Sequence, residues 1–246
     1  MTNVTAIVLT KNEDKHIAKC LTSVSFCNEV IVIDDNSTDA TLAIARKLGA
    51  KIFTRELAGN WAKQRNFGLE KAKSKWVFYV DADEVVSSLL KFEILTAIKS
   101  DFDGFYFKRK VKFLGKNLKY GETANVKLLR LAKKNIGIWR RNVHEYWDIN
   151  GDFKTLRNPL IHNFHSNLNQ FISAINKMAV IHAQENAKEG KKALLIKVLF
   201  FPFGKFIVNY ILLLGFLDGV RGFVFAVMMS FHSFLAWSTH YLIKER

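Results

Sequence analysis

Short apolar runs alternate with longer helical segments through residues 1–100, and this alternation limits the folds that the chain can adopt. The runs typical of buried strands read VTAIVL, EVIVID, KIFT and WVFYV, and a segment of helical character separates each from the next. Neighbouring parallel strands need a crossover connection, which is usually a helix. The pattern therefore predicts an α/β fold in which helices cover a parallel sheet.

Capping residues mark where the connecting helices begin. Ser37 or Thr38 is the expected N-cap of the second helix, Gly49 follows its end, and the third helix is expected to open at Asn60. Beyond Ser100 the alternation stops, and GFYFKRKVKFLGKNLKYG predicts strands around a glycine-containing turn. This half of the chain is expected to add antiparallel strands, which makes the sheet mixed.

The C-terminal region differs in kind from the rest. Residues 167–190 predict an amphipathic helix, and residues 194–243 are mostly apolar. The residues that interrupt the apolar stretch are Lys197, Pro202, Lys205, Asp218 and Arg221. A spanning helix needs about 20 apolar residues, and these interruptions leave shorter apolar runs. We therefore expect helices that lie in the membrane plane or re-enter it. A buried helical pair in a soluble core is the alternative.

Three carboxylates follow the strand WVFYV, at Asp81, Asp83 and Glu84. Side chains at i and i+2 of an extended segment point to the same side, so Asp81 and Asp83 can converge on one object. Mg²⁺, Mn²⁺ or the hydroxyls of a sugar would relieve their mutual repulsion. A solvated acidic turn is the other interpretation of this triplet.

Polar residues also follow the first two predicted strands. Thr10, Asn12 and Glu13 come after the first strand, and Asp34 and Asp35 end the second. Ligands of open parallel sheets bind at the carboxyl ends of the strands. The sequence therefore predicts a binding site at this edge, with Asp34 in a structural role.

The chain is strongly basic, with 37 Lys and Arg against 22 Asp and Glu and a net charge of +15. Much of the excess lies between residues 104 and 157. Such a charge suits nucleic acid, an anionic membrane or a phosphate-rich substrate. The N-terminus has no basic region followed by a long apolar run, so we expect no signal peptide. Cys20 and Cys27 do not form a disulfide framework or a zinc motif.

Four segments together resemble glycosyltransferase family 2, whose members have the GT-A fold. They are AIVLTKNED, VIVIDDNSTDAT, NWAKQRNFGL and WVFYVDADE, in that order. The later segments LLRL, VHE, PLIH and GFLDGVRGFVFA are similar to those of lipopolysaccharide inner-core glucosyltransferases. The resemblance implies a GT-A type Rossmann-like mixed sheet flanked by helices, followed by a C-terminal apolar helical region that associates with membranes.

The resemblance also implies a nucleotide-sugar site. Thr10, Asn12 and Glu13 match positions beside the nucleoside, and Asp35 matches the residue that accepts a hydrogen bond from uracil. Arg65 matches a basic residue near the base or diphosphate. Asp81 is expected to contact the ribose, and Asp83 is expected to ligate Mg²⁺ or Mn²⁺ and so to be catalytic.

Family 2 enzymes invert the anomeric carbon, so a base must take the proton of the acceptor hydroxyl. We expect Glu145 to be this catalytic base, with Asp148 and Glu122 in reserve. An ion pair of Glu145 with Arg140 or Arg141 is the structural alternative. His162 matches a subgroup motif, although a histidine at a strand end is commonly structural.

The resemblance predicts a GT-A catalytic domain at residues 1–166, with a nucleotide-sugar half at 1–100 and an acceptor half at 101–166. Residues 167–246 are expected to form a helical C-terminal region that is membrane-associated. The expected activity is transfer of a hexose from a nucleotide diphosphate sugar, UDP-glucose being the expected donor, to a lipopolysaccharide-core or lipid-linked acceptor. The expected location is the cytoplasmic face of the inner membrane, without nucleic acid as a partner. A nucleic-acid-binding protein and a membrane-attached scaffold with a degenerate site are the alternatives.

Overall fold

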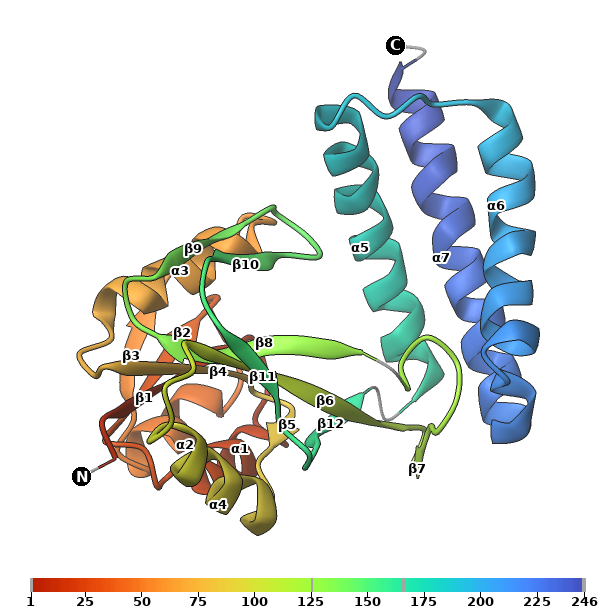
Figure 1. The fold of residues 1–246 in the computed structure, drawn as a ribbon. Coiled ribbons are helices and arrows are strands. Elements are labelled where there is room, and N and C mark those ends of the chain that lie inside the picture. Colours follow the sequence, from red (N-terminus) through yellow and green to blue (C-terminus); the bar gives the residue numbers. More distant parts are fainter. Residues whose placement is uncertain (1, 125, 165–166, 245–246) are drawn as a thin grey trace. The chain divides into compact units, whose positions relative to one another are not determined.

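The computed structural model of the chain describes residues 2–124, 126–164 and 167–244. The chain forms two compact units, each shown in Figure 1. The sheet unit comprises Met1–Arg109 and Lys127–His162, and the helical unit comprises Lys110–Val126 and Asn163–Arg246. A segment from the middle of the chain therefore belongs with the C-terminal helices. The boundary expected after residue 166 adjoins residues 165 and 166, which lie outside the described residues.

A mixed sheet forms the centre of the sheet unit, as the sequence predicts. Its parallel part has the order β3-β2-β1-β4, formed by β1 (Val4–Thr10), β2 (Glu29–Asp34), β3 (Lys51–Thr54) and β4 (Trp76–Asp81). β8 (Lys127–Lys133) pairs antiparallel with β4, and β6 (Gly104–Phe113) pairs antiparallel with β8. The remaining strands of this unit are β5 (Glu84–Val85), β9 (Gly137–Arg140), β10 (Tyr146–Ile149), β11 (Phe153–Thr155) and β12 (Leu160–Phe164).

Helices cover both faces of this sheet (Figure 1). The core on one face includes side chains of α1 (Ile17–Ser23), α2 (Thr41–Lys47) and α4 (Ser88–Ala97). The other face packs against α3 (Trp61–Lys71) and the β9–β10 hairpin. Strand residues that alternate between the two cores, such as Val8 and Ile7, give the sheet two buried faces.

The structure confirms one predicted helix start and corrects another. Asn60 caps α3, since its side chain accepts a hydrogen bond from the amide of Lys63 at 2.8 Å. The second helix begins later than predicted, at Thr41, and Asp39 accepts from the Thr41 amide at 2.9 Å. Ser37 instead donates to the carboxylate of Asp34 at 2.5 Å, so it is not available as the cap.

The helical unit consists of α5 (Leu168–Lys188), α6 (Leu195–Ile207), the π-helical turn η1 (Val208–Leu212), the 3₁₀ turn η2 (Gly215–Asp218) and α7 (Val220–Lys244). α7 packs against both α5 and α6. β7 (Lys116–Asn117) forms a hairpin with the end of β6, and Phe113 of this hairpin contacts the rings of Phe171 and Phe225.

Two helical stretches, Leu195–Leu212 and Val220–Ile243, are long and apolar enough to cross a membrane by length and composition. None of the described residues of α6 is buried. A helix of a soluble core would bury one of its faces. The structure therefore does not support the alternative of a buried helical pair for α6.

Candidate functional site

The ends of three parallel strands bring polar side chains together at one edge of the sheet. β1 ends at Thr10, β2 at Asp34 and β4 at Asp81. The register pairs Thr10 with Asp34 and Leu9 with Asp81. The amide of Asp35 donates to the carbonyl of Thr10 at 2.9 Å, which joins the turns that follow β1 and β2. The strand ends marked in the sequence therefore lie side by side.

Asn12 holds the two turns together. Its backbone adopts a left-handed φ of 53°, and its side-chain oxygen accepts from the Thr38 amide at 2.8 Å. Its own amide donates to Ser37 Oγ at 2.9 Å. Thr10 is buried, and its hydroxyl has no hydrogen-bond partner among the described residues. Because buried hydroxyls ordinarily find partners, this group is suited to meet a ligand.

Asp35 is buried and held from two sides. One carboxylate oxygen accepts from the Leu57 amide at 2.8 Å, and the other pairs with Lys11 Nζ at 2.7 Å. The side chain of Lys11 is 57% exposed, whereas that of Asp35 is 10% exposed. An exposed lysine can move away at low cost, so a ligand donor can take its place beside Asp35.

Glu13 lies within the electrostatic field of the acidic triplet. Its carboxylate is 2.9 Å from His16 Nδ1, and its amide donates to Thr41 Oγ1 at 2.8 Å. Burial raises the pKa of Glu13 above its ordinary value, His16 opposes that shift, and the charge of Asp83 adds to it. A cation bound near Asp83 would therefore also favour the ionised form of Glu13.

Three guanidinium groups surround Asp81. Its carboxylate oxygens lie 2.7 Å from Arg130 Nη2, 3.1 Å from Arg65 Nη2 and 3.2 Å from Arg109 Nη2. Burial raises the pKa of Asp81, but Arg130, Arg65 and Arg109 together hold it well below its usual range. The side chain of Asp81 is 27% exposed, whereas those of Arg65 and Arg130 are 3% and 5% exposed. The Asp81 carboxylate is thus ionised, held in place by three arginines and partly open to a ligand.

Glu84 is the buried member of the triplet. Its Oε1 accepts from Arg109 Nη2 at 2.5 Å, and its Oε2 accepts from the Asp81 amide at 2.9 Å. The repulsion expected within the triplet is therefore relieved at Asp81 and Glu84 by arginines. A signal for Arg109 exists in the sequence, because it shares the inward positions of β6 with Phe107 and Val111.

Asp83 has a different partner. Its Oδ2 lies 2.9 Å from His162 Nε2, and His162 sits on β12 opposite Glu84 of β5. His162 is buried, and the Asp83 side chain is 24% exposed. From the sequence, His162 was expected to be structural, and the match of PLIH to a subgroup motif was the signal for this contact.

Glu145 lies at the turn between β9 and β10. Its Oε1 accepts from Arg65 Nε at 2.8 Å, so the ion pair considered as the alternative forms with Arg65 rather than Arg140. Arg140 pairs with Asp148 instead. The other reserve base, Glu122, belongs to the helical unit and pairs with Lys205. Arg65 thereby connects Glu145 to Asp81, which lie far apart in the sequence.

A cavity of about 240 Å³ adjoins Glu145. Its lining includes Tyr106, Lys127, Tyr146 and Trp147. The ring of Trp147 stacks on that of Trp139 with 5.3 Å between centroids. Aromatic walls with a few polar groups are typical of pockets for small molecules. We call this cavity the aromatic pocket.

Arg65→Met is expected to destabilise the sheet unit strongly. The substitution removes the cation between Asp81 and Glu145, and breaking a buried ion pair on one side costs about 3–5 kcal/mol. Lys51→Met is the matched control, because Lys51 is 57% exposed in its pair with Glu29 and such pairs contribute about 0–1 kcal/mol. Urea unfolding followed by tryptophan fluorescence measures both. Equal losses in the two variants would contradict a stabilising role for Arg65.

Comparison with known proteins identifies what the chain is similar to. The sequence model of the family described as "Glycosyl transferase family 2" matches residues 5–176. An uncharacterized glycosyltransferase of Rickettsia conorii is 28% identical over 251 residues, which cover 94% of this chain and 87% of the relative. The lipopolysaccharide core biosynthesis glycosyltransferase LpsC of Rhizobium meliloti is 27% identical over 246 residues, which cover 92% and 89%.

Solved structures with a detectable likeness include S. aureus TarS 1-349. It has a TM-score of 0.49 and 16% identity, with 98% of this chain and 90% of that chain covered. Glucosyl-3-phosphoglycerate synthase from Mycobacterium tuberculosis, in complex with Mn²⁺, UDP and glucosyl-3-phosphoglycerate, has a TM-score of 0.41 and 15% identity, with 54% of this chain and 57% of that chain covered.

Proposed function

The chain belongs to glycosyltransferase family 2, and we propose that it transfers a hexose from UDP-glucose, with inversion at the anomeric carbon, to a lipopolysaccharide-core or lipid-linked sugar. The observation that carries this proposal is the meeting of Thr10, Asp35, Asp81 and Asp83 at the carboxyl edge of one parallel sheet segment.

Asp35 suits a uracil base. A carboxylate can accept the hydrogen bond of the uracil N3–H, whereas the N3 of cytosine is itself an acceptor and would face Asp35 unfavourably. Lys11 would leave Asp35 when the base binds. Asp81 can accept from ribose hydroxyls because it is ionised, partly exposed and held by its arginines. Thr10 and Asn12 would shape the floor beside the nucleoside.

Asp83 and His162 fit a divalent ion. Among the described residues, no group of three His, Cys, Asp or Glu side chains forms a metal cluster. Mg²⁺ is commonly bound through one or two protein ligands together with substrate phosphates and water. Asp83 Oδ2 lies 2.9 Å from His162 Nε2, so these two side chains are close enough together to hold one ion between them and the substrate phosphates. A bound Mg²⁺ or Mn²⁺ would stabilise the charge of the departing diphosphate.

Glu145 is the proposed base. Its Oε1 is held by Arg65, and its Oε2 has no partner in the part of the chain that the structure describes. Arg65 would fix the orientation of the carboxylate while Oε2 takes the proton of the acceptor hydroxyl. Arg65 itself is 2% exposed, so we give it a positioning role between Glu145 and Asp81.

The aromatic pocket is the proposed place of the acceptor sugar. It adjoins Glu145, its aromatic walls suit the apolar face of a sugar ring, and Lys127 supplies positive charge. The inner core of lipopolysaccharide and polyprenyl diphosphates are anionic, so this charge would attract them. The similarity to LpsC, named for lipopolysaccharide core biosynthesis, supports the same acceptor class.

Such acceptors reside at membranes, and we propose that the helical unit keeps the enzyme at the cytoplasmic face of the inner membrane. α6 and α7 carry exposed large apolar side chains, including Phe200, Phe203 and Val220 at 62%, 69% and 77% exposure. Contiguous exposed apolar surface commonly marks a protein or membrane contact.

A panel of nucleotides and nucleotide sugars tests the donor assignment. UDP-glucose with Mn²⁺ is expected to raise the thermal unfolding midpoint, because a ligand that binds only the folded state stabilises it. CDP-glucose is expected to give a smaller shift, since cytosine lacks the N3–H. Equal shifts with both would contradict the role of Asp35. No shift with any donor, together with retention on heparin, would favour the nucleic-acid alternative.

A further inference from the structure

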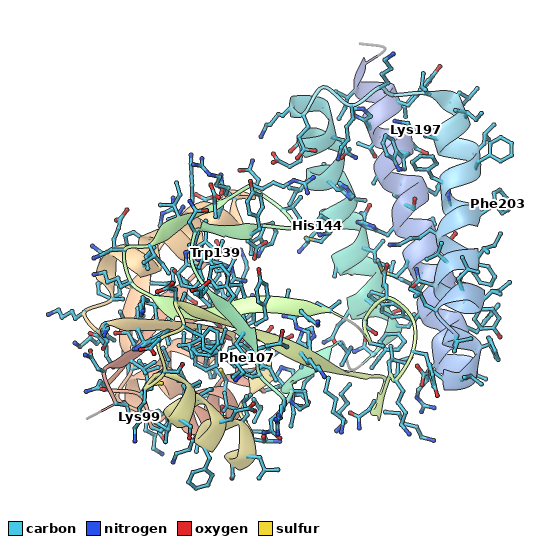
Figure 2. All side chains as sticks on the ribbon, in the orientation of Figure 1. Lys99, Phe107, Trp139, His144, Lys197 and Phe203 are labelled. Atoms are coloured by element: carbon cyan, nitrogen blue, oxygen red, sulfur yellow. The ribbon has the colours of Figure 1, made fainter. Side chains whose placement is uncertain are left out.

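We infer that the α6–α7 hairpin lies in the plane of an anionic lipid bilayer rather than across it. The inference rests on the membrane association proposed above and specifies its geometry. The immersed surface, which we call the α6 apolar face, is formed by Ile196, Leu199, Phe200, Phe203 and Ile207 of α6 and by Ile211 of the adjoining η1. These side chains recur at helical spacing, and each is between 46% and 69% exposed. In Figure 2, Phe203 projects from α6 on the side away from α7.

The polar residues that interrupt the apolar stretch have partners within the helical unit. Lys205 pairs with the carboxylate of Glu122. The buried Asn209 accepts from the Glu122 amide at 3.0 Å. Lys197 Nζ donates to the carbonyl of Lys192 at 2.9 Å and lies 4.5 Å from the ring centre of Trp237. Satisfied polar groups no longer oppose contact between this hairpin and lipid.

The turn of the hairpin is bound to a segment that we call the clamped loop, residues 114–122. The carboxylate of Asp218 accepts from the amides of Lys119 and Tyr120, both at 2.9 Å. Arg221 Nε donates to the carbonyl of Leu114 at 3.1 Å. Lys205 and Asn209 hold Glu122 at the other end of this loop. Residues far apart in the sequence thus fasten the clamped loop to the tip of the hairpin.

Chain connectivity places the turn on the same side of the membrane as the sheet unit. The clamped loop follows β6 and leads to β8, and these two strands pair with each other in the sheet. Neither end of the loop can therefore lie across a bilayer from the sheet. If α6 crossed the membrane, its first residue would be on the far side, and α5 would have to cross in order to reach it.

α5 is unsuited to crossing. Of the described helices, α6 with η1 and α7 are apolar enough to span, and α5 is not. α5 carries Lys177, Glu185 and Lys188 among several other polar residues, and charged side chains within a bilayer are expensive. α5 packs on α7, and α7 packs on α6. Figure 1 shows α7 between the other two helices, so α6 is an outer layer of this unit.

Charge at one end of the hairpin suits anionic headgroups. Lys188, the last residue of α5, and Lys191 and Lys192, in the connection from α5 to α6, are all exposed and lie near the start of the α6 apolar face in the sequence. Basic residues beside an apolar helix face strengthen binding to anionic lipid. This combination favours a lipid surface over a second copy of the same basic chain as the occupant of the face.

Spin-label depth measurements distinguish the two geometries. The full chain would be labelled at Ile196→Cys, Leu199→Cys, Phe203→Cys or Ile207→Cys and bound to vesicles of phosphatidylcholine and phosphatidylglycerol. The native Cys20 and Cys27 are buried, and unlabelled parent protein checks that they do not react. Residues 196 and 207 are about 16 Å apart along a helix axis. An in-plane helix places all four labels at one shallow depth. A spanning helix spreads their depths over about 16 Å.

Asn176→Cys on α5 is the matched control, because Asn176 is exposed at mid-helix. We expect its label to stay accessible to a water-soluble relaxation agent. A graded depth along α6 with a lipid-buried label at position 176 would overturn the inference. Failure to bind vesicles, with self-association in its place, would also overturn it. Donor protection by UDP-glucose and Mn²⁺, measured on the same variants, shows separately whether the transferase proposal holds.

Discussion

Asp83→Asn is expected to abolish glycosyl transfer while the protein stays folded. Asparagine has nearly the same shape as aspartate and can still bond His162, which lies 2.9 Å from the carboxylate. The substitution removes the charge that would hold a divalent ion opposite the departing diphosphate. Loss of such electrostatic stabilisation costs about 10²–10³-fold in turnover for a single group, and we expect a loss at least at the upper end. Metal-dependent binding of UDP is expected to disappear with it.

Asp101→Asn is the matched control, because it removes an exposed carboxylate of the same unit. We expect it to keep wild-type turnover and UDP binding. Initial rates with UDP-glucose and calorimetric titration of UDP, with and without Mn²⁺, provide the measurements. Full activity of the Asp83→Asn variant would show that Asp83 does not hold the metal. It would also contradict the proposed stabilisation of the departing diphosphate.

Glu145→Gln is expected to lower turnover by about 10²–10⁴-fold, the contribution typical of a general base. The amide oxygen of glutamine can still accept from Arg65 Nε, which is 2.8 Å from the Glu145 carboxylate. The site should therefore keep its geometry, and the KM for the donor should change little. A fall in turnover without a change in KM separates loss of a base from loss of binding.

The loss of turnover must be specific to Glu145 if this residue is the base. Asp148→Asn serves as the comparison, since Asp148 pairs with Arg140 at a more exposed position. Unchanged turnover for Glu145→Gln, with a loss for Asp148→Asn, would move the base to Asp148.

Local patterns in the sequence were sufficient to predict the parallel strands and the meeting of their polar ends at one edge of the sheet. Each strand is a short apolar run, and each run ends in polar residues such as Thr10, Asp35 and Asp81. Because carboxyl ends of parallel strands share one edge, the strand pattern also predicted which residues would meet. The start of α2 was misjudged, since Ser37 bonds Asp34 rather than the helix.

For the β6 and β8 arginines that pair with the acidic triplet, the sequence carries one signal, the alternation along β6, and that signal concerns Arg109 alone. Arg109 and Arg130 come from β6 and β8, whose pairing is fixed only by tertiary structure and is shifted by a bulge at Phe105 and Tyr106. The basic run around Arg109 was interpreted as part of a general positive field, although alternation along β6 turns this one side chain inward. Long-range ion pairs have no local signature comparable to a helix cap.

The interrupted apolar stretch also required the structure for its interpretation. Lys205, Asp218 and Arg221 read in sequence as breaks in an apolar segment, yet each bonds to residues 114–122. The bonded residues are 83 apart for Lys205 and Glu122, 99 apart for Asp218 and Lys119, and 107 apart for Arg221 and Leu114. No periodicity within the apolar stretch could have predicted that its charged residues hold a distant loop.

The most direct test of the central claim is a crystal structure of the protein with UDP and Mn²⁺, with the ion located by anomalous scattering at the manganese absorption edge. We expect the anomalous peak beside the carboxylate of Asp83, with the diphosphate as a further ligand and the uracil ring next to Asp35. A peak on Glu84 or Asp81 alone, or UDP bound away from the ends of β1, β2 and β4, would contradict the claim that this sheet edge holds the donor.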